Sequence, residues 1–180
     1  PNDALDLRYY TNKQLMEQID EALRTKKEGE IRILVFADNT CTYRLADNIG
    51  TARLSYPAET RIIRVPSVSR ITPKLLLYAF KSGADGIFMG ECDNRASPYT
   101  GSVDKIKKNV SLVKEILKKE GISEERLKFA ELLASLLTDF YKHITELTKF
   151  LKKEEPISIE KRERLWEIAK NELFSERVEA

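Results

Sequence analysis

Short apolar runs alternate along the chain with longer segments in which apolar residues recur every three or four positions. The short runs are rich in Ile, Val and Phe and are bounded by polar residues, a pattern typical of strands buried on both faces. They predict strands at residues 31–38, 60–67 and 87–92. The longer segments have the spacing of amphipathic helices and predict helices at residues 5–27, 43–54, 73–82, 103–120 and 159–174.

Residues at the predicted helix starts support these boundaries. Thr11 is a candidate N-cap, and Gln14 lies where a capping box places its second partner. Thr72 precedes Pro73, and proline is favoured at the first position of a helix. Ser158 is a candidate N-cap for the last helix.

Residues 127–135 are compatible with two structures. Their periodicity alone allows the start of a long helix that ends near Leu151. The regular alternation of strands and helices instead requires a fourth strand at this point. We favour a short strand followed by a helix from about residue 136.

Strands that alternate with helices through short connections predict a parallel sheet with right-handed crossovers. The expected fold is α/β, with a three-layer, Rossmann- or flavodoxin-like core of about four strands and added N- and C-terminal helices. We expect the core at residues 30–152 and helical extensions at residues 1–29 and 153–180. The last helix has an apolar stripe suited to packing on the core or on a partner. The stripe consists of Ile159, Leu165, Trp166, Ile168, Ala169 and Leu173.

The composition argues against several functional classes. Lys and Arg number 31 against 29 Asp and Glu, so the net charge of +2 does not indicate binding to nucleic acid. No apolar run approaches the ~20 residues of a membrane span, and the first residues lack a secretory signal pattern. We therefore expect a cytoplasmic protein without membrane insertion and without a nucleic-acid partner.

The two cysteines of the chain, Cys41 and Cys92, lie at the ends of two different predicted strands. Ligands and cofactors of open parallel sheets collect at the carboxyl ends of the strands, so both thiols are expected on one rim. The simpler interpretation is that they are free cysteines, which commonly behave as small buried hydrophobic residues. No feature of the sequence requires a disulfide.

Other candidate chemistry on this rim is less specific. Asp38, Glu91 and Asp93 are carboxylates that either hold a hard cation or cap helix N-termini, and capping is the commoner role. His143 is the only histidine and is expected on a helix surface, which argues against a histidine-based zinc site and a Ser-His-Asp triad. The sequence also lacks the glycine-rich motifs that cradle phosphates.

Three blocks of the sequence resemble a known family. These blocks read ILVFADNTCTYRLAD, SYPAETRIIRVPSVSRITPKLLLYAFKSGADGIFMGEC and VKEILKKEGISEERLKF. They are similar, in order and in spacing, to the iron–sulfur delta subunit of methyl-viologen-reducing hydrogenase. The resemblance covers about residues 31–150.

The resemblance implies a small subunit that carries one [2Fe–2S] cluster. Such a subunit passes electrons from a hydrogenase, or another oxidoreductase, into a heterodisulfide-reductase-type complex that performs flavin-based electron bifurcation. The cluster cysteines of the family are similar in position to Asp38, Cys41, Ser67, Cys92 and Ser97 of this chain. Only two of these five positions hold a cysteine here.

The lack of cysteines at three of the five family positions decides which function we expect. A [2Fe–2S] cluster takes four protein ligands, nearly always thiolates, whereas this rim offers Cys41 and Cys92 alone. We therefore expect a cluster-free docking subunit of a heterodisulfide-reductase-type redox complex, which is not catalytic by itself. One alternative is an electron-transfer subunit that still carries an iron–sulfur cluster. Another alternative is a redox-active dithiol, or a soft-metal site, formed by the two cysteines.

Overall fold

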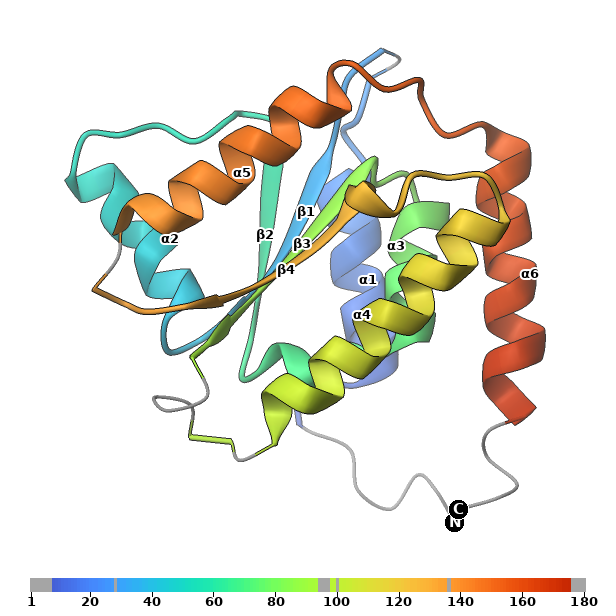
Figure 1. The fold of residues 1–180 in the computed structure, drawn as a ribbon, viewed down its shortest axis with the longest axis horizontal. Helices are drawn as coiled ribbons and strands as arrows, with labels where there is room; N and C mark the ends of the chain where they lie inside the picture. Colours follow the sequence, from blue (N-terminus) through green and yellow to red (C-terminus); the bar gives the residue numbers. More distant parts are fainter. Residues whose placement is uncertain (1–7, 28, 94–97, 100, 136, 176–180) are drawn as a thin grey trace.

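A computed structural model describes residues 8–27, 29–93, 98–99, 101–135 and 137–175 (Figure 1). The helices are α1 (Asn12–Leu23), α2 (Thr42–Thr51), α3 (Pro73–Lys81), α4 (Ser102–Lys119), α5 (Leu137–Leu151) and α6 (Ile159–Ser175). The strands are β1 (Ile33–Asp38), β2 (Thr60–Val65), β3 (Gly86–Cys92) and β4 (Leu127–Leu132).

The four strands form one sheet in the order β2-β1-β3-β4, and every neighbouring pair is parallel. The expected α/β fold with a parallel sheet of about four strands is therefore confirmed. The segment that allowed two structures forms β4 and then α5, as we favoured. Pairing with β3 satisfies the backbone groups of β4 that face this strand, and periodicity along the chain cannot reveal such a pairing.

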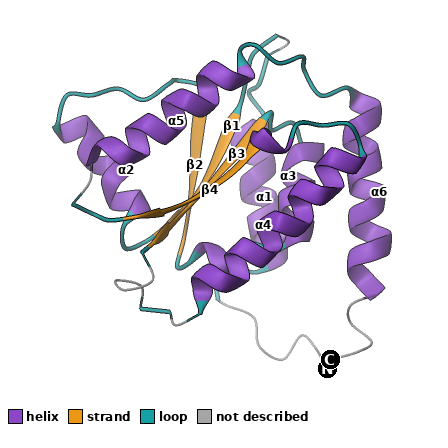
Figure 2. Cartoon of the chain, in the orientation of Figure 1, coloured by secondary structure: helices purple, strands orange, loops and turns teal. Residues whose placement is uncertain are grey.

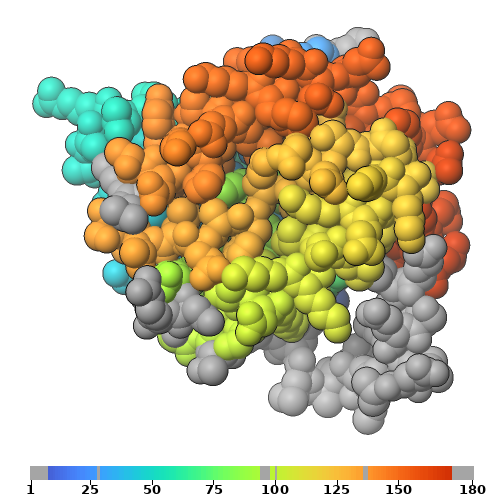
Figure 3. Space-filling model, in the orientation of Figure 1, coloured from blue at the N-terminus to red at the C-terminus, as the bar shows by residue number. Residues whose placement is uncertain are grey.

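The sheet separates two layers of helices (Figure 2). On one face, α1, α3, α4 and α6 pack over strand side chains that include Phe36 and Met89. On the other face, α2 and α5 pack over a smaller core that contains Val35 and Phe88. In the space-filling view, α4 and α5 cover the side of the molecule that faces the reader (Figure 3).

The N-caps predicted at Thr11, Thr72 and Ser158 are confirmed, but α1 begins after Thr11 and not at the predicted residue 5. The Gln14 backbone N–H donates to Thr11 Oγ1 over 3.2 Å, and the Thr11 N–H donates back to Gln14 Oε1 over 3.1 Å, which completes the capping box. Thr72 accepts a hydrogen bond from the backbone at the start of α3. Helix α1 ends at Leu23, before the predicted residue 27, and Lys26 beyond it forms an ion pair with Asp85.

Both terminal helices pack on the core. Leu165 and Ala169 of α6 are buried in the same cluster as α1 and α3, and the Trp166 ring meets the Tyr78 ring at a centroid distance of 5.1 Å. The predicted apolar stripe is wrong at Ile159, which is 81% exposed, because this residue opens the first turn of α6 away from the core. The side chain of Leu173 lies outside the described residues.

A buried ionic cluster at the amino ends of the strands fastens α6 to the sheet. Arg162 of α6 donates to Asp85 Oδ1 over 2.8 Å and to the Ala84 carbonyl over 2.8 Å, and it also contacts the Phe80 carbonyl. Asp85 in turn accepts from the Arg32 backbone N–H over 2.8 Å. Asp85 pairs with both Arg162 and Lys26, and the cluster therefore links α6 to the segments that precede β1 and β3.

Of the helices among the described residues, none combines the length and the apolar character needed to cross a membrane.

Candidate functional site

The candidate site lies at the carboxyl ends of β1 and β3, which are neighbours in the sheet. The chain leaves β1 into α2 on one face of the sheet, and it leaves β3 into α4 on the opposite face. The two connections therefore diverge, which makes this point a topological switch point of the sheet. Open α/β sheets bind their ligands in the crevice at such a point.

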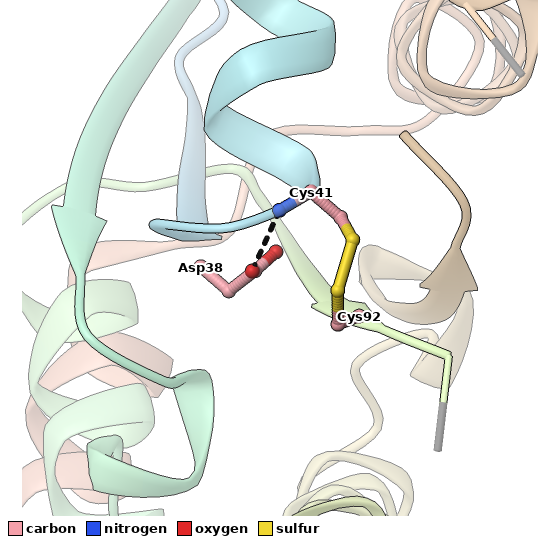
Figure 4. A group of neighbouring side chains, drawn as sticks. All are labelled: Asp38, Cys41 and Cys92. Atoms are coloured by element: carbon pink, nitrogen blue, oxygen red, sulfur yellow. Dashed lines mark hydrogen bonds between the residues drawn. A yellow bond between two sulfur atoms is a disulfide. The ribbon is translucent and has the colours of Figure 1, made fainter. Parts of the chain in front are cut away.

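Cys41 and Cys92 lie together at this switch point and form a disulfide (Figure 4). Their Cα atoms are 5.3 Å apart, and the two residues are only 4% and 1% exposed. The prediction that both cysteines lie on one rim is confirmed, whereas the interpretation that they are free cysteines is wrong. Adjacent strands lie about 4.8 Å apart, so residues at neighbouring strand ends come within bonding range.

Asp38 ends β1 and caps the start of α2. Its Oδ2 atom accepts hydrogen bonds from the backbone N–H groups of Thr40 and Cys41, over 2.8 and 2.9 Å, and its Oδ1 atom accepts from Thr42 over 2.8 Å. The carboxylate is fully buried, and these donors compensate for its lost hydration. The capping role that we considered for the rim carboxylates is therefore confirmed for Asp38.

Glu91 and Ser67 form a second buried pair on this rim. Ser67 Oγ donates to Glu91 Oε2 over 2.8 Å, and the Val68 backbone N–H donates to the same oxygen over 2.7 Å. Glu91 is fully buried, and within the described residues its Oε1 atom has no hydrogen-bond partner. Burial raises the pKa of Glu91 above its ordinary value, and the nearby Asp38 carboxylate raises that pKa further.

The remaining candidate residues are more peripheral. Asp93 is half-buried, and its backbone N–H donates to the Leu132 carbonyl over 3.1 Å. His143 was expected on the helix surface but is half-buried, and its ring stacks on Phe88 at a centroid distance of 5.6 Å. Ser97 lies outside the described residues.

The described donor set does not fit a [2Fe–2S] cluster. The sulfur atoms of Cys41 and Cys92 are bonded to each other, and Ser67 is committed to Glu91. Asp38 offers oxygen, which is a poor donor for a thiophilic iron–sulfur centre. The described rim therefore holds two sulfur donors where a cluster of this kind takes four ligands.

We expect the substitution Glu91→Gln to raise the free energy of unfolding at pH 7 by on the order of 1 kcal/mol. The folded state holds Glu91 with a raised pKa, so ionising this carboxyl costs more free energy in the folded state than in the unfolded state. This group therefore stabilises the fold below its ordinary pKa of about 4.3, and the contribution is lost as the pH rises through the folded pKa. Glutamine keeps an oxygen for Ser67 and Val68 and carries no ionisation cost.

Denaturant unfolding at pH 7 and at pH 4.5 measures this effect. The gain from Glu91→Gln is expected to shrink at the lower pH, while the exposed control Glu124→Gln changes little at either pH. A Glu91→Gln variant that is less stable than the wild type at pH 7 contradicts this account of the buried carboxyl.

Fold and site together define an open, parallel α/β protein with a pair of strand-end cysteines at a topological switch point. Residues 33–153 match the family described as methyl-viologen-reducing hydrogenase, delta subunit, and the chain belongs to this family. The resemblance found in the sequence is thereby confirmed.

Two kinds of curated relative are similar to the chain. One belongs to the ferredoxin:CoB-CoM heterodisulfide reductase of Methanosarcina mazei and is 34% identical over 157 residues, a match that covers 87% of the chain and 20% of the relative. The other is the iron-sulfur subunit of F420-non-reducing hydrogenase from Archaeoglobus profundus. It is 31% identical over 135 residues, covering 75% of the chain and 98% of the relative. The chain thus spans about a fifth of the heterodisulfide reductase relatives and nearly the whole of this hydrogenase subunit.

Proposed function

We propose that this protein is a docking subunit of a larger redox complex and binds no iron–sulfur cluster of its own. The observation that carries the proposal is a family fold whose described strand-end rim contains only two sulfur donors, bonded to each other. Such a chain is suited to contribute shape and contacts to a complex. Electron transfer through a cluster within this chain would need ligands that its described residues do not supply.

The proposed partner is a subunit of the heterodisulfide-reductase type. The same kind of sequence forms about a fifth of the heterodisulfide reductase relative, and nearly all of the iron-sulfur subunit of the hydrogenase relative. A domain found both fused to a longer chain and as a separate subunit is expected to contact that longer chain in either setting. We further propose that the extensions at residues 1–29 and 153–180 enlarge the contact surface.

The strand-end rim is the proposed contact. Arg64 on β2 is exposed there, and its guanidinium lies over the Tyr43 ring at 5.1 Å from the centroid. Lys119, at the far end of α4, is exposed at the opposite end of the sheet. Reversing the charge of Arg64 tests a contact through the rim, and reversing the charge of Lys119 controls for a non-specific effect of charge.

Affinity isolation of the tagged full chain from its native host, under anaerobic conditions, tests the proposal. We expect a heterodisulfide-reductase-type subunit to co-purify with the wild type and with Lys119→Glu, and to be reduced at least about tenfold with Arg64→Glu, a loss of about 1.4 kcal/mol. Recovery of the wild-type chain without such a subunit contradicts the docking role. Equal recovery of the partner subunit with Arg64→Glu and with Lys119→Glu would show that the partner does not bind through the rim.

Iron and sulfide analysis of the isolated chain, after anaerobic reconstitution, provides the control for the cluster. We expect a colourless protein without stoichiometric iron. A stoichiometric, redox-active cluster in the isolated chain would support the electron-transfer alternative instead.

The disulfide favours a second candidate function, a redox-active dithiol. Cys41 lies at the N-terminus of α2, where the helix dipole stabilises a thiolate and so favours reduction. Thiol counts after equilibration with dithiol buffers of increasing reducing strength test this function. A pair that stays oxidised throughout the range counts against it.

A further inference from the structure

We infer that the reduced forms of Cys41 and Cys92, together with Asp38, bind one divalent cation of the zinc class. The inference is independent of the docking role, because it concerns the isolated chain. One sulfur from each cysteine and one carboxylate oxygen of Asp38 all lie within 4.8 Å of one another. The donors come from two neighbouring strand ends, and Figure 4 shows the Asp38 carboxylate beside the two sulfur atoms.

The surroundings of Asp38 hold its carboxylate in place. Three backbone N–H groups fix the orientation of both oxygens, in the way that outer-shell hydrogen bonds orient the ligands of metal sites. A carboxylate oxygen has a second lone pair, and Oδ1 accepts only one of these three hydrogen bonds. Asp38 can therefore cap α2 and still offer one oxygen to a cation.

Close packing between α2 and β3 brings the cysteines together. Gly90 lies two residues before Cys92, and a Cβ atom at this glycine would lie 2.6 Å from Thr42 Oγ1. Thr42 follows Cys41 and is fully buried, and among the described residues its hydroxyl oxygen has no hydrogen-bond partner. This hydroxyl packs against Gly90, on the strand that carries Cys92, and is a polar group within the packing between α2 and β3. A water molecule commonly completes a three-ligand zinc site.

The charge of the site also favours a cation. All three donor residues are buried, and two thiolates and a carboxylate in such a place are costly without compensation. The disulfide removes two of these charges in the oxidised state. In the reduced state a divalent cation compensates the two negative charges of the thiolates. Disulfide formation and metal binding are therefore alternative ways to neutralise the site.

The donor chemistry selects the metal. Two thiolates and one carboxylate suit Zn²⁺ and its spectroscopic substitute Co²⁺, whereas Mg²⁺ and Ca²⁺ prefer sites made of oxygen alone. Opening the site requires a dithiol, which supplies two electrons and two protons and becomes a disulfide as the Cys41–Cys92 bond breaks. Binding of the cation then releases the two thiol protons to solvent.

Titration of the dithiol-reduced full chain with Co²⁺, under anaerobic conditions and after removal of the dithiol, tests the site. We expect one Co²⁺ per chain, with thiolate-to-cobalt charge-transfer absorption and the intense visible bands of tetrahedral Co²⁺. The oxidised chain is expected to show neither. Zn²⁺ should displace the cobalt and raise the thermal unfolding temperature of the reduced chain alone.

Three variants assign the ligands. Cys92→Ser is expected to abolish the charge-transfer band, Asp38→Asn to weaken Co²⁺ binding at least about tenfold, and the exposed control Asp47→Asn to leave it unchanged. Thermal unfolding of each variant shows whether it is folded. Because Asp38 also caps α2, an Asp38→Asn variant that does not fold leaves the assignment to the wild-type titration and to Cys92→Ser.

Specific results would overturn the inference. A reduced wild-type chain that shows no thiolate-to-cobalt band lacks the site. A band that survives Cys92→Ser places the metal elsewhere, and a folded Asp38→Asn variant with wild-type affinity removes Asp38 from the ligand set.

Discussion

Replacing Arg162 with alanine is expected to lower the free energy of unfolding by about 3 kcal/mol, because several buried acceptors lose their donor. The guanidinium is buried, pairs with Asp85 over 2.8 Å, and donates to the carbonyls of Ala84 and Ile157. Its removal leaves Asp85 Oδ1 and these carbonyls without this donor, while Asp85 Oδ2 keeps its contacts with Lys26 and the Arg32 backbone N–H. Burial lowers the pKa of Arg162 below its ordinary value, but the guanidinium stays charged at neutral pH.

Arg164 on the same helix is the matched control. Its side chain is 61% exposed and pairs with Glu120 over 2.9 Å, so Arg164→Ala is expected to cost at most about 1 kcal/mol. Denaturant unfolding followed by circular dichroism measures both variants. Equal losses for the two substitutions would mean that the buried cluster does not hold α6 to the sheet.

Reduction of the Cys41–Cys92 disulfide is expected to lower the free energy of unfolding by about 2–4 kcal/mol. The bond joins residues that are 51 positions apart, and it therefore restricts a large part of the unfolded chain. Unfolding curves with and without a dithiol, in the absence of metal, measure the difference.

The double variant Cys41→Ala with Cys92→Ala controls for other effects of the dithiol. Its unfolding curve is expected to be the same with and without reductant. Wild-type curves that superimpose under the two conditions, with complete reduction shown by thiol counts, contradict the prediction.

The oxidation state of the Cys41–Cys92 pair bears on the proposed metal site and on the proposed redox function. Oxidation locks α2 to β3 at the switch point, whereas reduction frees two thiols beside Asp38. A loss of stability on reduction that zinc restores would be the behaviour expected of the proposed metal site. A loss without such recovery is the behaviour expected of a structural or redox disulfide.

Much of the fold could be predicted from local patterns. The capping box of Thr11 and Gln14, and the Thr72 cap, mark helix starts through contacts that span only three residues. The short apolar runs identified the strands because a parallel strand is buried on both faces. The segment at β4 needed the whole alternation of elements, since its own periodicity is compatible with a helix.

The candidate site could be predicted only in part. Both cysteines were expected on one rim because strand ends meet at one edge of a parallel sheet. Their bond to each other was not expected, since it depends on the strand order that makes β1 and β3 neighbours. The burial of Glu91 and its contact with Ser67 span 24 residues and leave no local signal.

The order of residues along the chain was thus sufficient for the type and position of most elements, because helix caps and apolar periods act over a few neighbours. Packing in three dimensions decided which distant groups meet. Arg162 contacts Asp85, which is 77 positions away in the sequence, and Cys41 can bond to Cys92 only once the sheet has formed. Such contacts depend on strand order and helix placement, which follow from the burial of the whole core and cannot be inferred from any single segment.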